Sequence, residues 1–195
     1  MAKISSVCVY CGSSFGRDRR HRQDAVRLGQ ALAAHGLTLV YGGGGVGLMG
    51  ALAEASLAAG GRVVGILPSF LVREEKGLKG LSELEVVDSM HARKERMFAL
   101  ADAFIVLPGG LGTLDETFEV LTWKQLGLHD KPVVLVDSGG YWQDLRRLIA
   151  HLVEEGFAPE RAERFLHVVP GIEEALAYIL THAASRAKPA AGKRL

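Results

Sequence analysis

The residues best suited to chemistry form a glycine turn followed by two acids, Pro108-Gly-Gly-Leu-Gly-Thr-Leu-Asp-Glu116. The turn follows an apolar run, residues 103–107, and opens an amphipathic segment that ends near Gly127. Backbone amides at a helix start favour an anion, so these amides and the Thr113 hydroxyl could hold a phosphate, with Glu116 one turn inside the helix. Thr113-x-x-Glu116 also matches a capping box, in which the glutamate only satisfies a backbone amide. Taken alone, this motif leaves both interpretations open.

A second group of residues is cationic and lies on the helix predicted to begin at Ser89. Met90, Arg93, Lys94 and Met97 recur at helical spacing, so two cations share one face with two methionines. A solvated face with long side chains reaching water would explain the pattern without any ligand. Because Arg93 stands beside an apolar stripe, we favour a role in binding a buried anion or an aromatic ligand.

A further glycine turn occupies residues 41–50, and a third polar turn, Gly12-Ser13-Ser14, follows the first predicted strand. Gly45, Gly47 and Gly50 fit the G-x-G-x-x-G pattern, but the next strand ends Gly-Ile-Leu-Pro without the acid that a dinucleotide site needs. No Gly-Lys-Ser/Thr follows either, so a P-loop is excluded. What remains is a backbone that a ligand can approach closely, with helix-start amides suited to an anion or a polar nucleotide edge.

Seven apolar β-type runs alternate with helical patterns along the chain. They are residues 7–10, 37–41, 62–67, 84–87, 103–107, 132–136 and a weaker 166–169. Consecutive apolar residues are typical of strands buried on both faces, and intervening helices favour parallel crossovers. The sequence therefore predicts an α/β fold, a Rossmann-like doubly wound parallel sheet of six to seven strands flanked by helices.

The ends of several elements are also predicted. Helices should span residues 19–35 and 48–59, each followed by glycine, and a last helix should run from Gly171 to about His182. Residues 68–82 are interpreted as a long surface loop, and residues 1–182 as one nucleotide-binding catalytic domain. We expect residues 183–195 to form a disordered basic tail.

Composition excludes several classes of protein. Among the 195 residues, Lys and Arg number 23 and Asp and Glu 22, and four of the basic residues follow His182. The rest of the chain therefore has 19 cations against 22 acids, which gives no electrostatic basis for binding nucleic acid. The start lacks a signal peptide and no apolar run could span a bilayer, so we expect no membrane partner and a cytoplasmic location. Two cysteines and seven histidines without ligand spacing predict no metal site.

Four of these motifs together resemble the LOG (Lonely guy) family, long labelled lysine decarboxylase-like. They are Cys11-Gly-Ser-Ser, Gly-Gly-Gly-Val-Gly-Leu-Met-Gly at 43–50, Met90-His-x-Arg-Lys94-x-x-Met97 and Pro108-Gly-Gly-x-Gly-Thr-x-x-Glu116. The resemblance extends from about Ser6 to about Leu180, in the family's order and spacing. Three positions depart from the family's pattern: Leu111, where the family often has Tyr, Asp115, where it often has Glu, and Gly45, where it often has Asn or Ser. These departures leave open which base the protein prefers.

The resemblance implies hydrolysis of the N-glycosidic bond of a nucleoside monophosphate, AMP or N6-isopentenyl-AMP, by a homodimer without a cofactor. By position, Arg93 and Glu116 would be the catalytic pair. The implied substrate contacts are Gly12, Ser13, Gly45, Met49, Gly50, Glu74, Lys94, Pro108, Gly109, Gly110, Gly112, Thr113, Asp115 and Thr122. A carboxylate suits this chemistry because it stabilises an oxocarbenium-like state and orients water. Arg93, which stays protonated, would hold phosphate or stabilise charge on the departing purine.

Three other functions remain open from the residues. The main one is a non-hydrolytic carrier of a nucleotide or cofactor on the same fold, as molybdenum-cofactor carriers similar to this family are, although the Arg93 and Glu116 pair counts against it. An amino-acid decarboxylase usually needs a lysine-bound pyridoxal phosphate in a larger fold, and no lysine here has such a setting. A regulatory module that acts only through protein contacts would not bind AMP.

Overall fold

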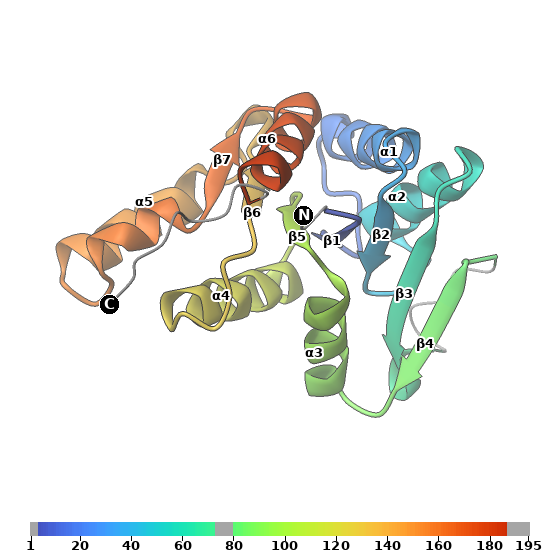
Figure 1. Cartoon of the computed structure of the whole chain (residues 1–195), viewed down its shortest axis with the longest axis horizontal. Helices are drawn as coiled ribbons and strands as arrows, with labels where there is room; N and C mark the ends of the chain where they lie inside the picture. The colour runs from blue at the N-terminus through green and yellow to red at the C-terminus, as the bar shows by residue number, and fades with distance from the viewer. Residues whose placement is uncertain (1–3, 73–79, 187–195) are drawn as a thin grey trace, which may run out of the picture.

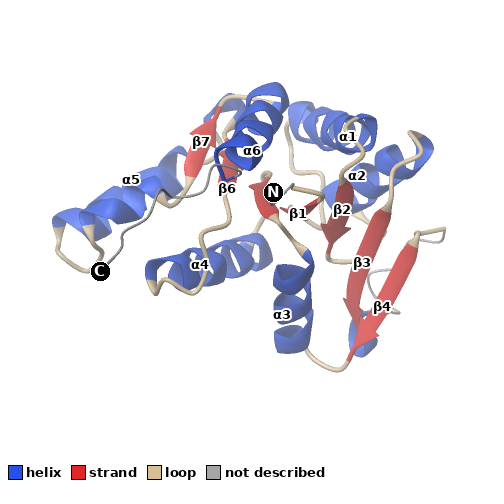
Figure 2. Ribbon diagram, in the orientation of Figure 1, coloured by secondary structure: helices blue, strands red, loops and turns tan. Residues whose placement is uncertain are grey.

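A computed structural model describes residues 4–72 and 80–186, which form one parallel sheet covered by helices on both faces (Figures 1 and 2). The strand order is β4-β3-β2-β1-β5-β6-β7, and every neighbouring pair is parallel. The strands are β1 (Ser6–Tyr10), β2 (Thr38–Tyr41), β3 (Val63–Pro68), β4 (Glu83–Val87), β5 (Ala103–Val106), β6 (Val133–Val136) and β7 (His167–Val169). The predicted fold class is confirmed, and each predicted strand lies within one residue of its expected ends.

Of the six α-helices in the described residues, five connect strands and the sixth follows β7, and together they divide the core into two layers. They are α1 (Arg19–Ala34), α2 (Gly47–Ala58), α3 (Met90–Leu100), α4 (Leu111–Gln125), α5 (Gln143–Glu154) and α6 (Ile172–Arg186). One apolar cluster packs α1, α2 and α6 against the sheet, and the other packs α3, α4 and α5 against the opposite face. The order of the strands reverses between β1 and β5, and the carboxyl ends of strands at such a point form the usual ligand crevice of an open α/β sheet.

Three boundaries differ from the sequence-based expectations. α4 begins at Leu111, two residues before Thr113, and α6 continues to Arg186 rather than ending near His182. Ser69–Leu71 forms a short 3-10 helix at the start of the predicted surface loop. The loop segment 73–79 and the last part of the predicted tail, 187–195, lie outside the described residues.

The two cysteines pack on opposite faces of the sheet, as their spacing on a strand predicts. Both are free thiols; Cys8 lies in the cluster beneath α3, α4 and α5, and Cys11 lies in the cluster beneath α1 and α2. Positions three apart on a strand face opposite ways, so no disulfide joins them.

A carboxylate fastens the start of β1 to the start of β5. One oxygen of Asp102 accepts hydrogen bonds from the backbone amides and hydroxyls of Ser5 and Ser6 at 2.8–3.0 Å. Partial burial acts to raise the pKa of Asp102, but these hydrogen bonds outweigh it and hold the pKa below its ordinary value. The strands that flank the reversal are thus held together at their amino ends as well as along their ladder.

We expect Gly29→Ala to destabilise the protein although the change favours helix in isolation. A Cβ at Gly29 would lie 2.3 Å from the carbonyl oxygen of Leu52, because α1 and α2 pack with their backbones in contact. Alanine normally gains about 1 kcal/mol over glycine within a helix, but overpacking here should cost about 1–3 kcal/mol. Urea unfolding measures whether Gly29→Ala lowers or raises the free energy of unfolding. Gly112→Ala, where a Cβ meets open space, is the matched control, and equal stability gains in both variants would contradict the expectation.

Candidate active site

The turn after β1 joins the two glycine turns at the point where the strand order reverses. The amide of Gly12 donates to the carbonyl of Pro108 at 3.0 Å, and the carbonyl of Gly12 accepts from the amides of Leu48 at 3.0 Å and Met49 at 3.4 Å. Two amides in the first turn of α2 therefore bind the protein's own backbone. These two amides are not free to hold an anion, and binding of a nucleotide edge by the rest of this turn stays a prediction.

The glycine at the start of α2 has a structural cause. Gly47 has a φ of +59°, and a Cβ there would lie 2.2 Å from the carbonyl carbon of Ser13. The turn after β1 crosses the start of α2 at this contact distance, so only glycine fits. Part of the glycine pattern at residues 41–50 therefore serves backbone packing.

The start of α4 is open, in contrast to the start of α2. Gly110 is the N-cap residue, and no side chain of the described residues caps the helix. A Cβ on Gly110 or Gly112 would meet no atom within 4 Å. Thr113 is the third residue of the helix and not its cap, so the capping-box interpretation is wrong, and Glu116 lies further inside the helix. The uncapped amides of this turn are suited to bind an anion.

A small pocket of about 170 Å³ lies in front of this helix start. It brings together residues from the turn after β1, the start of α2, α3 and the first turns of α4. The lining consists of Cys11, Gly12, Ser13, Met49, Arg93, Gly110, Leu111, Gly112, Thr113 and Glu116. Eight of these are predicted site residues, and both members of the predicted catalytic pair are among them; Cys11 and Leu111 are the additions.

Arg93 is buried, with 5% of its surface exposed, and hydrogen-bonded to the ends of two strands. Its Nη2 donates to the carbonyl of Gly42 at 2.7 Å, and its Nε donates to the carbonyl of Ile66 at 3.2 Å. Main-chain carbonyls beyond β2 and within β3 thus fix the guanidinium at the pocket wall. The guanidinium therefore places a positive charge at this wall of the pocket.

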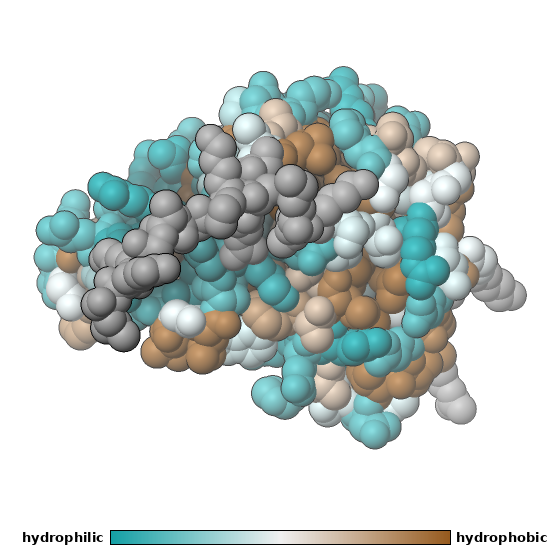
Figure 3. All heavy atoms as spheres, viewed as in Figure 1, coloured by the Kyte–Doolittle hydropathy of each residue, from teal (hydrophilic) through white to brown (hydrophobic). Residues whose placement is uncertain are grey.

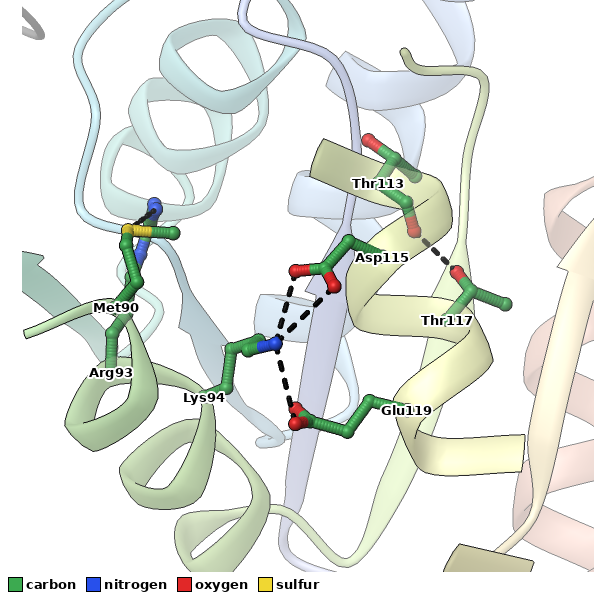
Figure 4. Close-up of polar contacts among 7 residues, drawn as sticks. All are labelled: Met90, Arg93, Lys94, Thr113, Asp115, Thr117 and Glu119. Atoms are coloured by element: carbon green, nitrogen blue, oxygen red, sulfur yellow. Dashed lines mark hydrogen bonds and ion pairs between the residues drawn. The ribbon is translucent and has the colours of Figure 1, made fainter. Parts of the chain in front are cut away.

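Lys94 points away from Arg93 and toward α4 (Figure 4). Its Nζ lies 3.0 Å from Asp115 Oδ2 and 3.3 Å from Glu119 Oε1. Burial opposes the charge, but hydrogen bonds to both carboxylates hold the pKa of Lys94 above its ordinary value. Lys94 and Asp115 therefore join α3 to α4 beside the pocket and do not line it.

The other predicted site residues lie around the pocket. Gly45 and Gly50 line a neighbouring hollow beside Phe15, and Pro108 and Gly109 line another beside the turn after β1. Thr122 is further along α4, where its hydroxyl donates to the carbonyl of Phe118. Glu74 lies outside the described residues.

Tyr141 contacts the site but was not predicted. Its hydroxyl donates to the carbonyl of Gly109 at 2.7 Å, and its ring meets the ring of His21 edge-on at 5.4 Å. Only its position in the sequence could have indicated Tyr141, because Gly139-Gly140-Tyr141 follows β6 and the carboxyl end of β6 lies beside that of β5. Tyr141 thus supports the turn that opens α4.

Burial and the charge of Glu116 together shift the pKa values of the two thiols near the end of β1. Burial, and next the negative charge of Glu116, raise the pKa of the Cys11 thiol. The same two causes, in the same order, raise the pKa of the Cys8 thiol. Both thiols stay protonated at neutral pH, so neither is a ready nucleophile. Within residues 4–72 and 80–186, no cluster of His, Cys, Asp and Glu could hold a metal ion.

Comparison with known proteins identifies the family. Residues 49–179 match the family model described as possible lysine decarboxylase. The cytokinin riboside 5′-monophosphate phosphoribohydrolase of Rhodococcoides fascians is 49% identical over 175 residues, which cover 89% of this chain and 88% of that protein. The chain belongs to the LOG family. A LOG enzyme of Arabidopsis thaliana with the same activity in its name is 42% identical over 89% of this chain and 81% of its own length.

Solved structures place the LOG chain in a wider fold group. The molybdenum cofactor carrier protein of Chlamydomonas reinhardtii superposes with a TM-score of 0.71 over 94% of this chain and 99% of that one. At 21% identity, the likeness shows the shared Rossmann-like fold alone. The LOG motifs therefore distinguish this chain within a fold that also serves carriers.

Proposed function

We propose that the protein hydrolyses the N-glycosidic bond of adenosine 5′-monophosphate or an N6-modified derivative, releasing an adenine-type base and ribose 5-phosphate. The observation that supports this most is the meeting of Arg93, Glu116 and the uncapped start of α4 in one pocket. The relatives named above are phosphoribohydrolases, and the reaction needs an anion site beside a carboxylate. Both are available within this pocket.

In this proposal, the start of α4, Glu116 and Arg93 each have a separate role. The 5′-phosphate binds the amides of Leu111, Gly112 and Thr113 at the positive end of α4. Glu116, one turn further along, faces the anomeric carbon, stabilises the developing oxocarbenium charge and orients the attacking water. Positive charge from Arg93, fixed by strand carbonyls, stabilises the negative charge that develops on the departing purine.

The test is product analysis on purified protein. AMP and N6-isopentenyl-AMP are incubated separately, and chromatography measures free base and ribose 5-phosphate. Release of both products in equal amounts supports the proposal and ranks the two substrates. Saturable binding of AMP without release would favour the carrier function, and the absence of any AMP binding would favour a regulatory module.

We further propose a homodimer, located in the cytoplasm. Exposed apolar side chains gather at the end of α4, with Leu126 and Leu128, and around α3 and β4, with Leu84, Val86 and Met90 (Figure 3). No helix of the described chain is long and apolar enough to cross a membrane. Light scattering at micromolar concentration should give about 42 kDa, twice the chain mass of 20.9 kDa. A mass near that of one chain would overturn the dimer.

A further inference from the structure

The first turn of α1 carries cations where a helix normally carries acids. It contains Arg19, Arg20 and Arg22 and no acidic residue. The positive end of the helix dipole disfavours such residues. The capping Asp18 pairs with Arg20 at 2.6 Å and leaves the others uncompensated. A local arrangement that opposes helix stability often serves a functional site.

A cavity of about 710 Å³ lies against this turn. Its wall includes four arginines and one aromatic ring: Arg17, Arg19, Arg22, Arg27 and Phe15. None of the four arginines forms an ion pair with any residue that the structure describes. The single acid of the wall is Asp18, which Arg20 already neutralises. We call this cavity the arginine pocket; its wall is strongly positive in a chain whose net charge is only +1.

The aromatic ring adds a second kind of contact. Phe15 is 43% exposed, and the guanidinium of Arg22 lies 5.1 Å from its ring centre. An exposed ring beside arginines can stack a heterocyclic base, while arginine binds phosphate oxygens in a bidentate manner. The cavity volume is within the usual range for small-molecule sites.

The arginine pocket and the pocket of Arg93 and Glu116 share no lining residue. A hollow of about 410 Å³ lies between them and shares Arg17 with the first and Gly110 with the second. His21 lines this hollow; it is 8% exposed, and its Nδ1 has no hydrogen-bond partner in the described chain. The unpartnered Nδ1 of His21 therefore belongs to this hollow, and the arginine pocket is defined by its arginines and Phe15 alone.

We propose that the arginine pocket is a second binding site, for a nucleoside di- or triphosphate. The phosphates lie among Arg17, Arg19 and Arg27, and the base stacks on Phe15. A single phosphate would leave most of the four arginines uncompensated, so the site selects polyphosphates over AMP. This site does not depend on the reaction proposed above.

Calorimetric titration with ATP tests the site on the full chain. The Glu116→Gln variant is saturated with AMP first, so that the pocket in front of α4 is occupied. We expect saturable ATP binding that AMP does not displace, and a Kd raised at least about tenfold by Arg19→Gln with Arg27→Gln. Phe15→Ala should weaken ATP binding and leave binding of inorganic tripolyphosphate unchanged. Arg147→Gln, on α5, is the control and should not change the Kd.

Four results would overturn the site. They are no saturable ATP binding at millimolar concentration, one-for-one displacement by AMP, an unchanged Kd in the double variant, and an equal loss of tripolyphosphate binding in Phe15→Ala. Tighter binding of a single-stranded oligonucleotide than of ATP would assign the surface to nucleic acid instead. Thermal melting of each variant checks folding, which these exposed substitutions should preserve.

Discussion

Replacing Glu116 by glutamine should lower the rate of base release from AMP by about 10²–10³-fold, the usual loss when one preorganised electrostatic group is removed. Glutamine keeps the shape of the side chain but removes the negative charge that faces the developing cation. Because the phosphate binds the start of α4 through backbone amides, KM should change little. Steady-state kinetics with quantified adenine separates the two parameters.

The control for this experiment is Glu95→Gln. Glu95 is an exposed carboxylate on α3 that does not line the pocket, so its loss changes the charge of the protein by the same amount. A Glu116→Gln variant as active as Glu95→Gln would remove the carboxylate from the mechanism. A large rise in KM with kcat retained would assign Glu116 to substrate binding instead.

Replacing Arg93 by lysine should reduce both activity and stability. A lysine ammonium cannot reproduce the fork that reaches the carbonyls of Gly42 and Ile66 together, so at least one buried carbonyl loses its donor. We expect a loss of about 1–3 kcal/mol in the free energy of unfolding, the cost of a buried unsatisfied group. The displaced charge should also lower kcat by about 10²-fold. Urea unfolding and product analysis on the same samples measure the two effects.

Arg96→Lys provides the matched control on the same helix. Arg96 pairs with Glu85 on β4 at 2.7 Å and its side chain is 43% exposed, so lysine can keep the ion pair at little cost. If Arg93→Lys has the same free energy of unfolding and the same kcat as Arg96→Lys, the bidentate role of Arg93 is wrong. If stability falls but kcat per folded molecule does not, Arg93 is purely structural.

The strands could be predicted from the sequence because burial on both faces leaves a continuous apolar run, and parallel strands joined by helices leave few topologies. The start of α4 could not, because Thr113-x-x-Glu116 fits a cap three residues after the actual N-cap, Gly110. The turn that precedes this helix is held by a contact distant in sequence, the hydrogen bond from the amide of Gly12 to the carbonyl of Pro108. Helix ends are decided by such contacts more than by local pattern.

Part of the pocket could be predicted from the sequence, and part could not. The resemblance to the LOG family predicted Arg93 and Glu116 as a pair, and one pocket contains both. The partners of Arg93 carry no sequence signal, since they are main-chain carbonyls that any residue supplies. Lys94 follows Arg93 directly, and a turn of about 100° per residue directs it to α4 instead. Tyr141 reaches Gly109 across 32 residues, a distance in sequence at which no local pattern reports contact.

The buried thiol of Cys8 on β1 offers a way to measure how often the sheet opens. Cys11 is 6% exposed and lines the pocket in front of α4, whereas Cys8 is 0% exposed and protonated in the closed form. A thiol reagent in water therefore reaches Cys8 only when the central strand separates from its neighbours. The rate of labelling at Cys8 therefore measures how often the middle of the sheet opens. A ligand bound at the end of β1 lowers the labelling rate in proportion to its occupancy, so the native cysteine reports ligand binding without an engineered label.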